Sequence, residues 1–254
     1  MFKRNKKVTI VDCYTYRADV FNYFPMSPAS EYVPEWFKTL PAPKWDSMLR
    51  GDRVSEQNNI KNCPVIMQYF KRGFVLPLWS DLEIEVGEKG TDHYQWQYSD
   101  CRSAITSHSN HQLPPNLLGY YIHLKLESPW MLKCEQGIDF LCTELEWSFN
   151  NIPSSMHLLK GVLDFRTNAA TNVNMFIKRE DKVQNILLKA GTPLLHYVPL
   201  VETKINMKTH LVTTEQYASV SDVNTQISAD ARHKQKIKRD FFKKPKKFKT
   251  LVDV

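Results

Sequence analysis

Short β-prone runs separated by turn residues dominate the middle of the chain. In Leu82–Val86 and Asn172–Ile177, apolar and polar residues partly alternate, as expected for a strand with one buried face. No helical segment separates successive runs, so the pattern predicts an antiparallel β-sandwich, barrel or β-clip and not a parallel sheet with crossover helices. The predicted strands are 74–79, 82–86, 94–98, 118–126, 138–145, 157–164, 172–178, 185–189 and 194–200.

The residues before this region predict little regular structure. Residues 8–13 form a β-prone run, and residues 21–45 are rich in proline and aromatic residues, which favours extended chain and short turns. One helical turn is predicted from Pro34 to Leu40, with Pro34 at its first position. A short helix is predicted within 62–73, where apolar residues recur at helical spacing and Gly73 supplies a C-terminal cap.

The β pattern fades after Leu200, and a helical pattern follows. Thr213 or Thr214 can cap a helix with Glu215 in its first turn, and apolar residues then recur every three to four positions. This helix is predicted to extend through the basic residues beyond it and to end at Pro245. The chain is thus divided into an extended N-terminal wrap (1–60), a β-rich core (61–205) and a helical basic tail (206–254).

Charge is distributed unevenly along the 254 residues, whose formal net charge is +7. Residues 232–249 contain ten Lys or Arg and one Asp, and residues 1–7 contain four more cations, so the remaining chain carries a net charge of −6. A basic tail on a mildly acidic body indicates contact with a polyanion through the tail.

Phenylalanine residues are interleaved with the cations of the tail. Cations neutralise phosphates, and aromatic rings stack on bases or dock into a partner's pocket. The expected partner is therefore nucleic acid or an acidic or apolar protein surface, with a merely solvated tail as the alternative. A further copy of the chain is also considered as a partner, and a membrane is not expected. The residues expected to make these contacts are Arg232, Lys234, Lys236, Lys238, Arg239, Phe241, Phe242, Lys243, Lys244, Lys246 and Lys247.

The cysteines and the N-terminal pattern bear on the compartment. Five cysteines at irregular spacing, without a Cys-x-x-Cys motif, favour a reduced protein with buried thiols. The N-terminal residues lack a signal-peptide pattern, and the longest apolar runs fall far short of the ~18 residues that cross a membrane. We therefore expect the protein in the cytoplasm of the cell that makes it.

Two groups of polar residues are candidates for metal binding. His108 and His111 stand three residues apart and can share a metal if further ligands converge on them; a polar loop with hydrogen-bonded imidazoles is the alternative. Asp81, Glu83 and Glu85 are predicted on one side of a strand, where they form either a cation site or a solvated face. The sequence indicates no particular cofactor.

One stretch resembles the β-clip proteins, the group of dUTPase and dCTP deaminase. The Gly161-Val-Leu-Asp164 run is followed thirty residues later by Gly191, and the resemblance covers about 74–200. It implies a β-clip fold and a role for Asp164 as an acid that positions or activates water. The sequence departs from the group after Asp164, where the expected tyrosine and glycine are absent, and upstream, where no arginine stands for the phosphate-binding segment. In the alternative reading, Asp164 merely ends a strand.

Most of the chain is also similar to a group of proteins from tailed phages and marine bacteria for which no activity is established. The similarity rests on Pro34-Glu-Trp36, Cys63-Pro64 with Gly73-Phe74, Pro77–Asp81, Ser107–Gln112, Ser128–Trp130 and Gly191–Pro193. It implies a phage-encoded protein, which is located in the host cytoplasm or incorporated in a virion.

Taken together, these patterns favour a non-enzymatic binding or assembly protein whose basic tail contacts nucleic acid or a partner protein. The alternative is a dUTPase-like enzyme that binds or hydrolyses a nucleotide. A metal-dependent, oxygenase-like β barrel is a third reading, and it requires His108 and His111 to converge with a carboxylate.

Overall fold

Four β-sheets form the body of the protein in this computed structural model, which describes residues 8–41, 60–100, 102–108, 117, 119–147, 152–166, 170–218 and 252–253. In hydrogen-bonded order, sheet A contains β16 (Val252–Asp253), β15 (Lys204–Leu211), β1 (Val8–Thr15) and β8 (Met131–Lys133). Sheet B contains β11 (Gly161–Asp164), β9 (Asp139–Thr143), β14 (Pro193–Pro199), β3 (Phe74–Pro77) and β2 (Ser27–Pro28). Sheet C contains β13 (Gln184–Leu188), β4 (Leu82–Val86) and β5 (Tyr94–Tyr98). Sheet D contains β10 (Met156–Leu158), β12 (Val173–Lys178), β7 (Tyr121–Leu126) and β6 (Ile105–Ser107).

Antiparallel pairing predominates in all four sheets. The exception among the described strands is the pair of β1 and β15, which run parallel in register from Val8 opposite Lys204 to Thr15 opposite Leu211. The prediction of a mainly β protein with antiparallel sheets is confirmed. Among the described residues, none of the helices has the length and apolar character that crossing a membrane requires.

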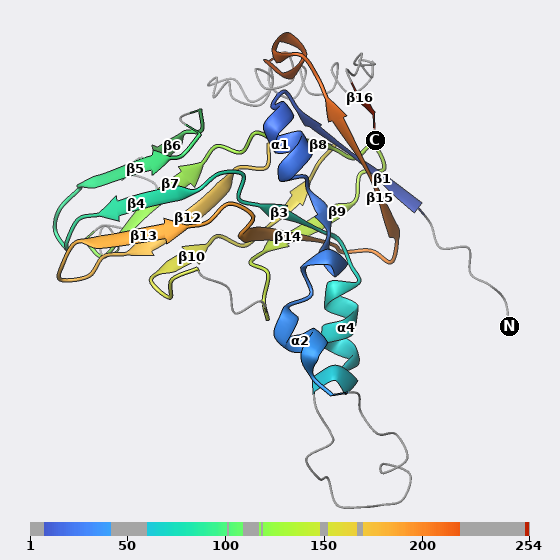
Figure 1. Ribbon diagram of the computed structural model, residues 1–254, viewed down its shortest axis with the longest axis horizontal. Helices are drawn as coiled ribbons and strands as arrows, with labels where there is room; N and C mark the ends of the chain where they lie inside the picture. Colours follow the sequence, from blue (N-terminus) through green and yellow to red (C-terminus); the bar gives the residue numbers. More distant parts are fainter. Residues whose placement is uncertain are drawn as a thin grey trace, which may run out of the picture.

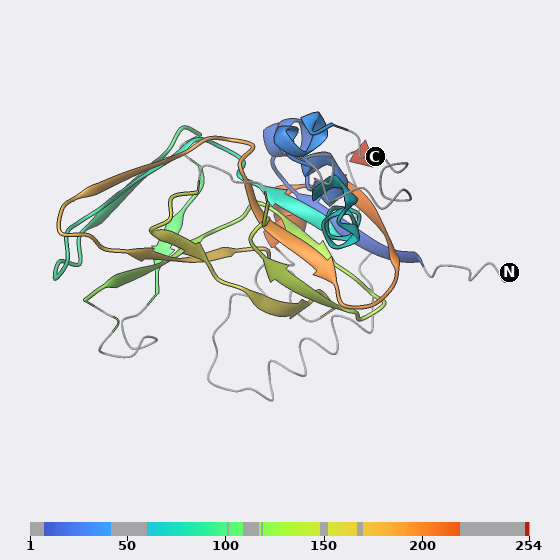
Figure 2. The same ribbon diagram turned by 90° about the horizontal axis from the view of Figure 1, so that it is seen from below.

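The sheets form two layered regions that meet end to end. Sheets C and D occupy one end of the molecule and sheets A and B the other (Figure 1), and the view from below separates sheet C from sheet D as two layers (Figure 2). The inward residues of β4, such as Ile84, and of β7, such as Leu124, are fully buried in the same apolar cluster as Val11 of β1 and Phe140 of β9. One continuous core therefore runs through both regions, as expected when alternate strand residues face inward.

The chain passes directly from one region into the other at two places, each time between consecutive strands. β3 of sheet B leads into β4 of sheet C, and β13 of sheet C leads into β14 of sheet B. Between them, the Leu78 amide donates to the Thr192 carbonyl at 2.8 Å, and the Gly191 amide donates to the Leu78 carbonyl at 2.7 Å. Backbone pairing thus continues across the joint, where Leu78 and Trp79 are almost completely buried.

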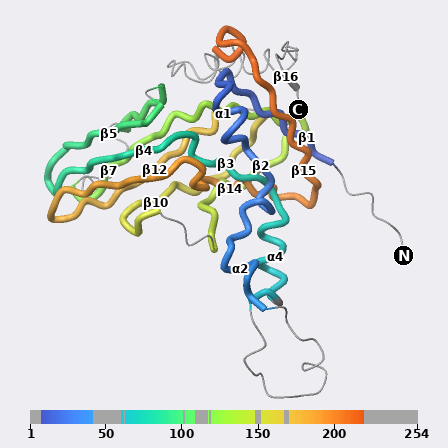
Figure 3. The backbone as a smooth tube through the Cα atoms, in the orientation of Figure 1, coloured from blue at the N-terminus to red at the C-terminus, as the bar shows by residue number. Residues whose placement is uncertain are grey.

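Short helices cover the outer face of sheet B. They are α2 (Glu35–Thr39) and α4 (Pro64–Phe70), with 3₁₀ turns η1 (Ala29–Tyr32) and η2 (Ile60–Asn62), whereas α1 (Ala18–Tyr23) contacts β1 and β15 of sheet A. α2 and α4 lie side by side and extend away from the sheets (Figure 3), and Phe37 contacts Phe70 with ring centroids 6.5 Å apart. Ile66 and Phe70 pack on Val75 of β3 in a small second core, so these helices shield the side of sheet B that sheet A leaves open.

The local patterns predicted most strands but missed long-range features. The predicted helices correspond to α2 and α4, except that Pro34 is the cap residue before α2 and not its first helical residue. The run 157–164 divides into β10 and β11, which belong to different sheets. α1 lies in the region expected to be extended. The prediction that the strands end at Leu200 is wrong. A further strand, β15, follows at Lys204–Leu211 and crosses residue 206, where the tail was predicted to begin.

The structure gives a physical reason for the missed strand. β15 contributes only half-buried Ile205 and Met207 to the core, and its alternate residues Lys204 and Lys208 are exposed, so its apolar signal is weak. Its partner β1 lies almost two hundred positions away in the sequence, which a local pattern does not report. The predicted helix beyond 218 and the whole basic segment lie outside the described residues.

Glycine at the end of α4 has a conformational role that can be tested. Gly73 has φ +74°, and a Cβ there would lie 1.9 Å from the Tyr197 carbonyl oxygen; Gly90 has φ +81° but open space around it. Gly90→Ala should therefore cost only the left-handed backbone penalty of about 1–2 kcal/mol. Gly73→Ala should cost clearly more, because β14 must also move. Urea unfolding of both variants measures the difference, and equal losses would contradict the close approach.

Candidate functional site

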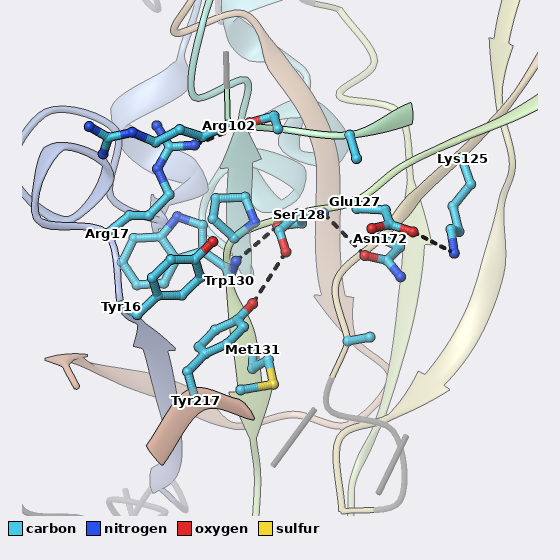
Figure 4. A pocket seen from close by; sticks show the side chains of 14 residues that line it. Tyr16, Arg17, Arg102, Lys125, Glu127, Ser128, Trp130, Met131, Asn172 and Tyr217 are labelled. Atoms are coloured by element: carbon cyan, nitrogen blue, oxygen red, sulfur yellow. Dashed lines mark hydrogen bonds and ion pairs between the residues drawn. The ribbon is translucent and has the colours of Figure 1, made fainter. Parts of the chain in front are cut away.

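A cavity of about 210 Å³ lies where sheets A and D meet. Its walls come from the residues after β1, the segment before β6, the connection from β7 to β8, the residues before β12 and the helical turn at 214–218. Figure 4 shows the side chains that line it, among them Tyr16, Arg17, Trp130 and Tyr217. Five segments distant in sequence thus converge on one small space, which is below the ~300 Å³ of most drug-sized ligand sites.

The charge on Arg17 is neutralised within the wall of this cavity. Its side chain is only 2% exposed, and its guanidinium donates to Asp19 at 2.5 and 3.2 Å and to Asp100 at 2.5 Å. Burial raises the pKa of Asp100, but hydrogen bonds from the Arg102 amide and from Arg17 outweigh this effect and hold that pKa below its usual value. Arg17 therefore serves as a structural cation with two counterions, and its charge is not available to a ligand.

A hydrogen-bond network fixes the connection between β7 and β8. The Ser128 amide donates to Asn172 Oδ1 at 3.1 Å, and Ser128 Oγ accepts from the Trp130 amide at 3.1 Å. Thr171 Oγ1 lies 2.8 Å from Ser128 Oγ and donates to the Trp130 carbonyl at 2.7 Å. These bonds orient Trp130, whose buried indole Nε1–H has no hydrogen-bond partner among the described residues.

The last described helical turn is attached to the same wall. Thr213 and Gln216 form a reciprocal capping box, in which each side chain bonds the other's backbone amide at 3.2 and 3.0 Å. Of the two caps that the sequence offered, Thr213 and Thr214, the structure uses Thr213. The Tyr217 hydroxyl donates to the Ser128 carbonyl at 3.3 Å, and its ring packs edge-on against Tyr16 at 4.8 Å. The residues that precede the basic segment are therefore anchored to the body.

The described lining of the cavity offers hydroxyl and charged side chains, most of which have partners within the protein. Arg17 is paired with Asp19 and Asp100, and Lys125 is paired with Glu127 at 3.1 Å, whereas Arg102 is exposed. The Ser128 hydroxyl lies in the network described above, the Ser103 hydroxyl accepts from Arg17 and Trp79, and the described residues of the lining include no imidazole or thiol. Little in the sequence indicates this site, although Ser128–Trp130 is one of the motifs of the phage-protein resemblance.

Asp164 lies apart from this cavity, at the end of edge strand β11. Its carboxylate accepts from the Arg166 amide at 2.8 Å and from Arg166 Nη2 at 3.1 Å. These bonds place Asp164 in the turn that follows the strand. This is the alternative interpretation given above, in which Asp164 merely ends a strand. A catalytic role for Asp164 stays a prediction.

His108 stacks on His123 of β7, with ring centroids 4.0 Å apart, and its Nε2 bonds Asn174 Oδ1 at 2.8 Å. His111 lies outside the described residues, as do all the tail residues from Arg232 to Lys247. Asp81, Glu83 and Glu85 do share the outer side of sheet C, where Asp81 binds Lys189 at 2.8 Å and Glu85 binds His93 at 3.0 Å. Within the described ranges, no group of three His, Cys, Asp or Glu side chains is arranged to hold a metal.

Comparisons with known proteins do not assign a family to this arrangement. No family model, curated protein or solved structure matches the chain.

The stacked imidazoles lead to a prediction about pH. Burial, together with the neighbouring His108, lowers the pKa of His123 to about 4, whereas the unfolded value is near 6.5. Between these values the unfolded chain binds a proton at this residue that the folded protein does not, so stability should fall as the pH drops from about 6.5 to about 4. His123→Phe, which retains an aromatic contact with Phe176, should make this dependence shallower.

Chemical denaturation at several pH values measures this effect. The matched control is His157→Phe on β10, because His157 is exposed and lies opposite Phe176 from the other side. A steep loss of stability that is the same in wild type and His123→Phe would contradict the assignment.

Proposed function

We propose that the protein is a non-enzymatic binding or assembly protein of phage type whose basic C-terminal segment contacts nucleic acid. The observation that carries the proposal is the separation of charge along the chain: ten cations and one Asp in 232–249, against a net charge of −6 in the chain outside both basic ends. A segment of this kind attracts phosphates, while the acidic body does not compete for them.

The cavity beside Tyr217 supports the binding reading over an enzymatic one. Its buried Arg17 is committed to Asp19 and Asp100, and the hydroxyl of Ser128 lies within a network of structural hydrogen bonds. Nucleophilic catalysis needs a nucleophile beside a base that activates it, and the described lining offers no such pair.

The anchoring of Tyr217 gives the basic segment a defined origin on the body. A tethered cationic segment binds with an effective concentration set by the chain that links it to its anchor. The capping box at Thr213 and the bond from Tyr217 to Ser128 supply that anchor, fifteen residues before the first cation of the segment at Arg232.

The dUTPase-like alternative has less support. Asp164 is bonded to Arg166 and does not line the described cavities, and the upstream arginine of the β-clip pattern is absent from the sequence. An acidic protein surface is the competing partner for the tail, and the experiment below separates it from nucleic acid.

Neutralising part of the tail should weaken binding in a salt-dependent way. The variant Lys243→Gln, Lys244→Gln, Lys246→Gln retains the phenylalanines and removes three cations. If each of them contacts a phosphate of single-stranded DNA, the slope of log K against log salt should become less negative by about 2. Fluorescence anisotropy with a labelled oligonucleotide, measured over a range of salt concentrations, gives this slope.

The matched control removes three exposed lysines of the body through Lys71→Gln, Lys204→Gln and Lys208→Gln. This control should leave the slope unchanged although its net charge equals that of the tail variant. Equal weakening by both variants, or none by either, would refute a contact made by the tail. Tighter binding to poly-glutamate than to DNA would instead identify an acidic protein surface as the partner.

A further inference from the structure

Arg179 is a buried arginine that forms no ion pair with a carboxylate among the described residues. It follows β12 directly, and the alternation of buried Val173, Met175 and Ile177 continues to Arg179, so its side chain points between sheets C and D. The residue is only 2% exposed. Its hydrogen bonds to Gly87, Thr91 and His93 place it beside the turn between β4 and β5. In Figure 1 this turn lies at the end of sheets C and D that is remote from sheet A.

The hydrogen bonds of Arg179 are few and long. Nη1 donates to the Gly87 carbonyl at 3.5 Å, to Thr91 Oγ1 at 3.3 Å and to the His93 carbonyl at 3.5 Å, all longer than the ~2.7–3.2 Å of well-formed bonds. Nε is buried without a partner among the described residues. Desolvation lowers the pKa of Arg179, and Asp92 opposes this only at a distance.

Arg17 provides an internal comparison at nearly the same burial. Its guanidinium forms ion pairs with both Asp19 and Asp100, whereas Arg179 forms none with a described residue. A buried cation without a counterion is strongly destabilising. The described residues therefore satisfy one buried arginine and leave part of the hydrogen-bonding capacity of the other unused.

A surface cavity of about 430 Å³, wide open to solvent, lies beside Arg179, between the β12–β13 turn and Lys89. Its lining contains four cationic and two acidic side chains: Lys89, Lys178, Arg179, Lys182, Glu180 and Asp181. Lys89 and Asp181 pair at 2.9 Å, which leaves a formal excess of two positive charges in the lining. A phosphate group carries about −1.5 to −2 charges at neutral pH.

We propose that this cavity binds a phosphate-type oxyanion, with Arg179 as its buried guanidinium and Lys178 and Lys182 at its rim. Guanidinium groups offer a planar set of donors that fits two oxygens of one phosphate. The oxyanion supplies the counterion that no described residue provides for Arg179. The inference does not depend on the basic tail, because all of its residues belong to the folded body.

Thermal unfolding of the full chain in phosphate tests the site. Millimolar inorganic phosphate should raise Tm relative to chloride at equal ionic strength, because a ligand that binds only the folded state stabilises it. Lys178→Gln with Lys182→Gln, both exposed, should fold normally and reduce this rise. The control variant Lys204→Gln with Lys208→Gln on β15 should retain the full phosphate-dependent rise in Tm. This control shows whether phosphate acts through a general salt effect and not through the site.

Arg179→Gln separates ligand binding from a purely structural role. If the site is as proposed, this variant should lose the phosphate-dependent rise while its Tm in phosphate-free buffer stays close to that of wild type. A large loss of Tm without phosphate, together with a wild type that does not respond to phosphate, would show that Arg179 only ties the β4–β5 turn to β12. A rise in Tm that is equal in wild type, Arg179→Gln and the rim variant would also overturn the proposal.

The source of the oxyanion is resolved by competition. A single-stranded oligonucleotide is added to wild type and to the variant with the three tail lysines neutralised. If it removes the phosphate-dependent rise in Tm of both proteins, the natural ligand is a phosphate of a nucleic-acid backbone. A response to inorganic phosphate that the oligonucleotide leaves intact identifies a free phosphate or a small phosphate ester.

Discussion

Hydrogen bonding between the backbone of Leu78 and that of Gly191 and Thr192 holds the two halves of this protein together. Because β3 continues into β4 and β13 into β14, these bonds prevent the sheets on either side of the joint from separating. Trp79, which follows Leu78, donates through Nε1 to Ser103 Oγ at 2.6 Å, and Ser103 belongs to the network of Arg17 and Asp100. The joint therefore also fixes one wall of the cavity at sheets A and D.

The two buried arginines, Arg17 and Arg179, have different roles in the structure. Arg17 lies between carboxylates from its own helix and from the turn after β5, so its charge contributes to the rigidity of the cavity wall. Among the described residues, Arg179 donates only to carbonyl and hydroxyl oxygens, so an external anion gains most at that position. Sequence position does not distinguish the two, since each lies within two residues of the end of a strand.

Strands with a strong alternation were predictable from the sequence because burial of one face imposes that alternation. Leu82–Val86 shows this alternation and matches β4 residue for residue; Tyr94–Tyr98 also matches β5, although only Tyr98 of that strand is fully buried. The elements that escaped depend on distant partners: β15 requires β1, and α1 is held near β15 after the turn at Arg17. Thr213 was predictable as a cap because its partner Gln216 is local, whereas the cavity beside it was not, since five segments build it.

The parallel pairing of β1 with β15 also has a consequence for how the chain folds during synthesis. β1 is among the first described residues to leave the ribosome, yet its parallel partner emerges some two hundred residues later. Pairing between such distant segments closes a large loop and slows folding. Until β15 arrives, β1 presents an unpaired edge to the nascent chain, and such an edge is open to pairing with the wrong strand. Sheet A therefore completes late, and a chaperone that shields β1 would increase the yield of folded protein more than one acting on sheets C and D.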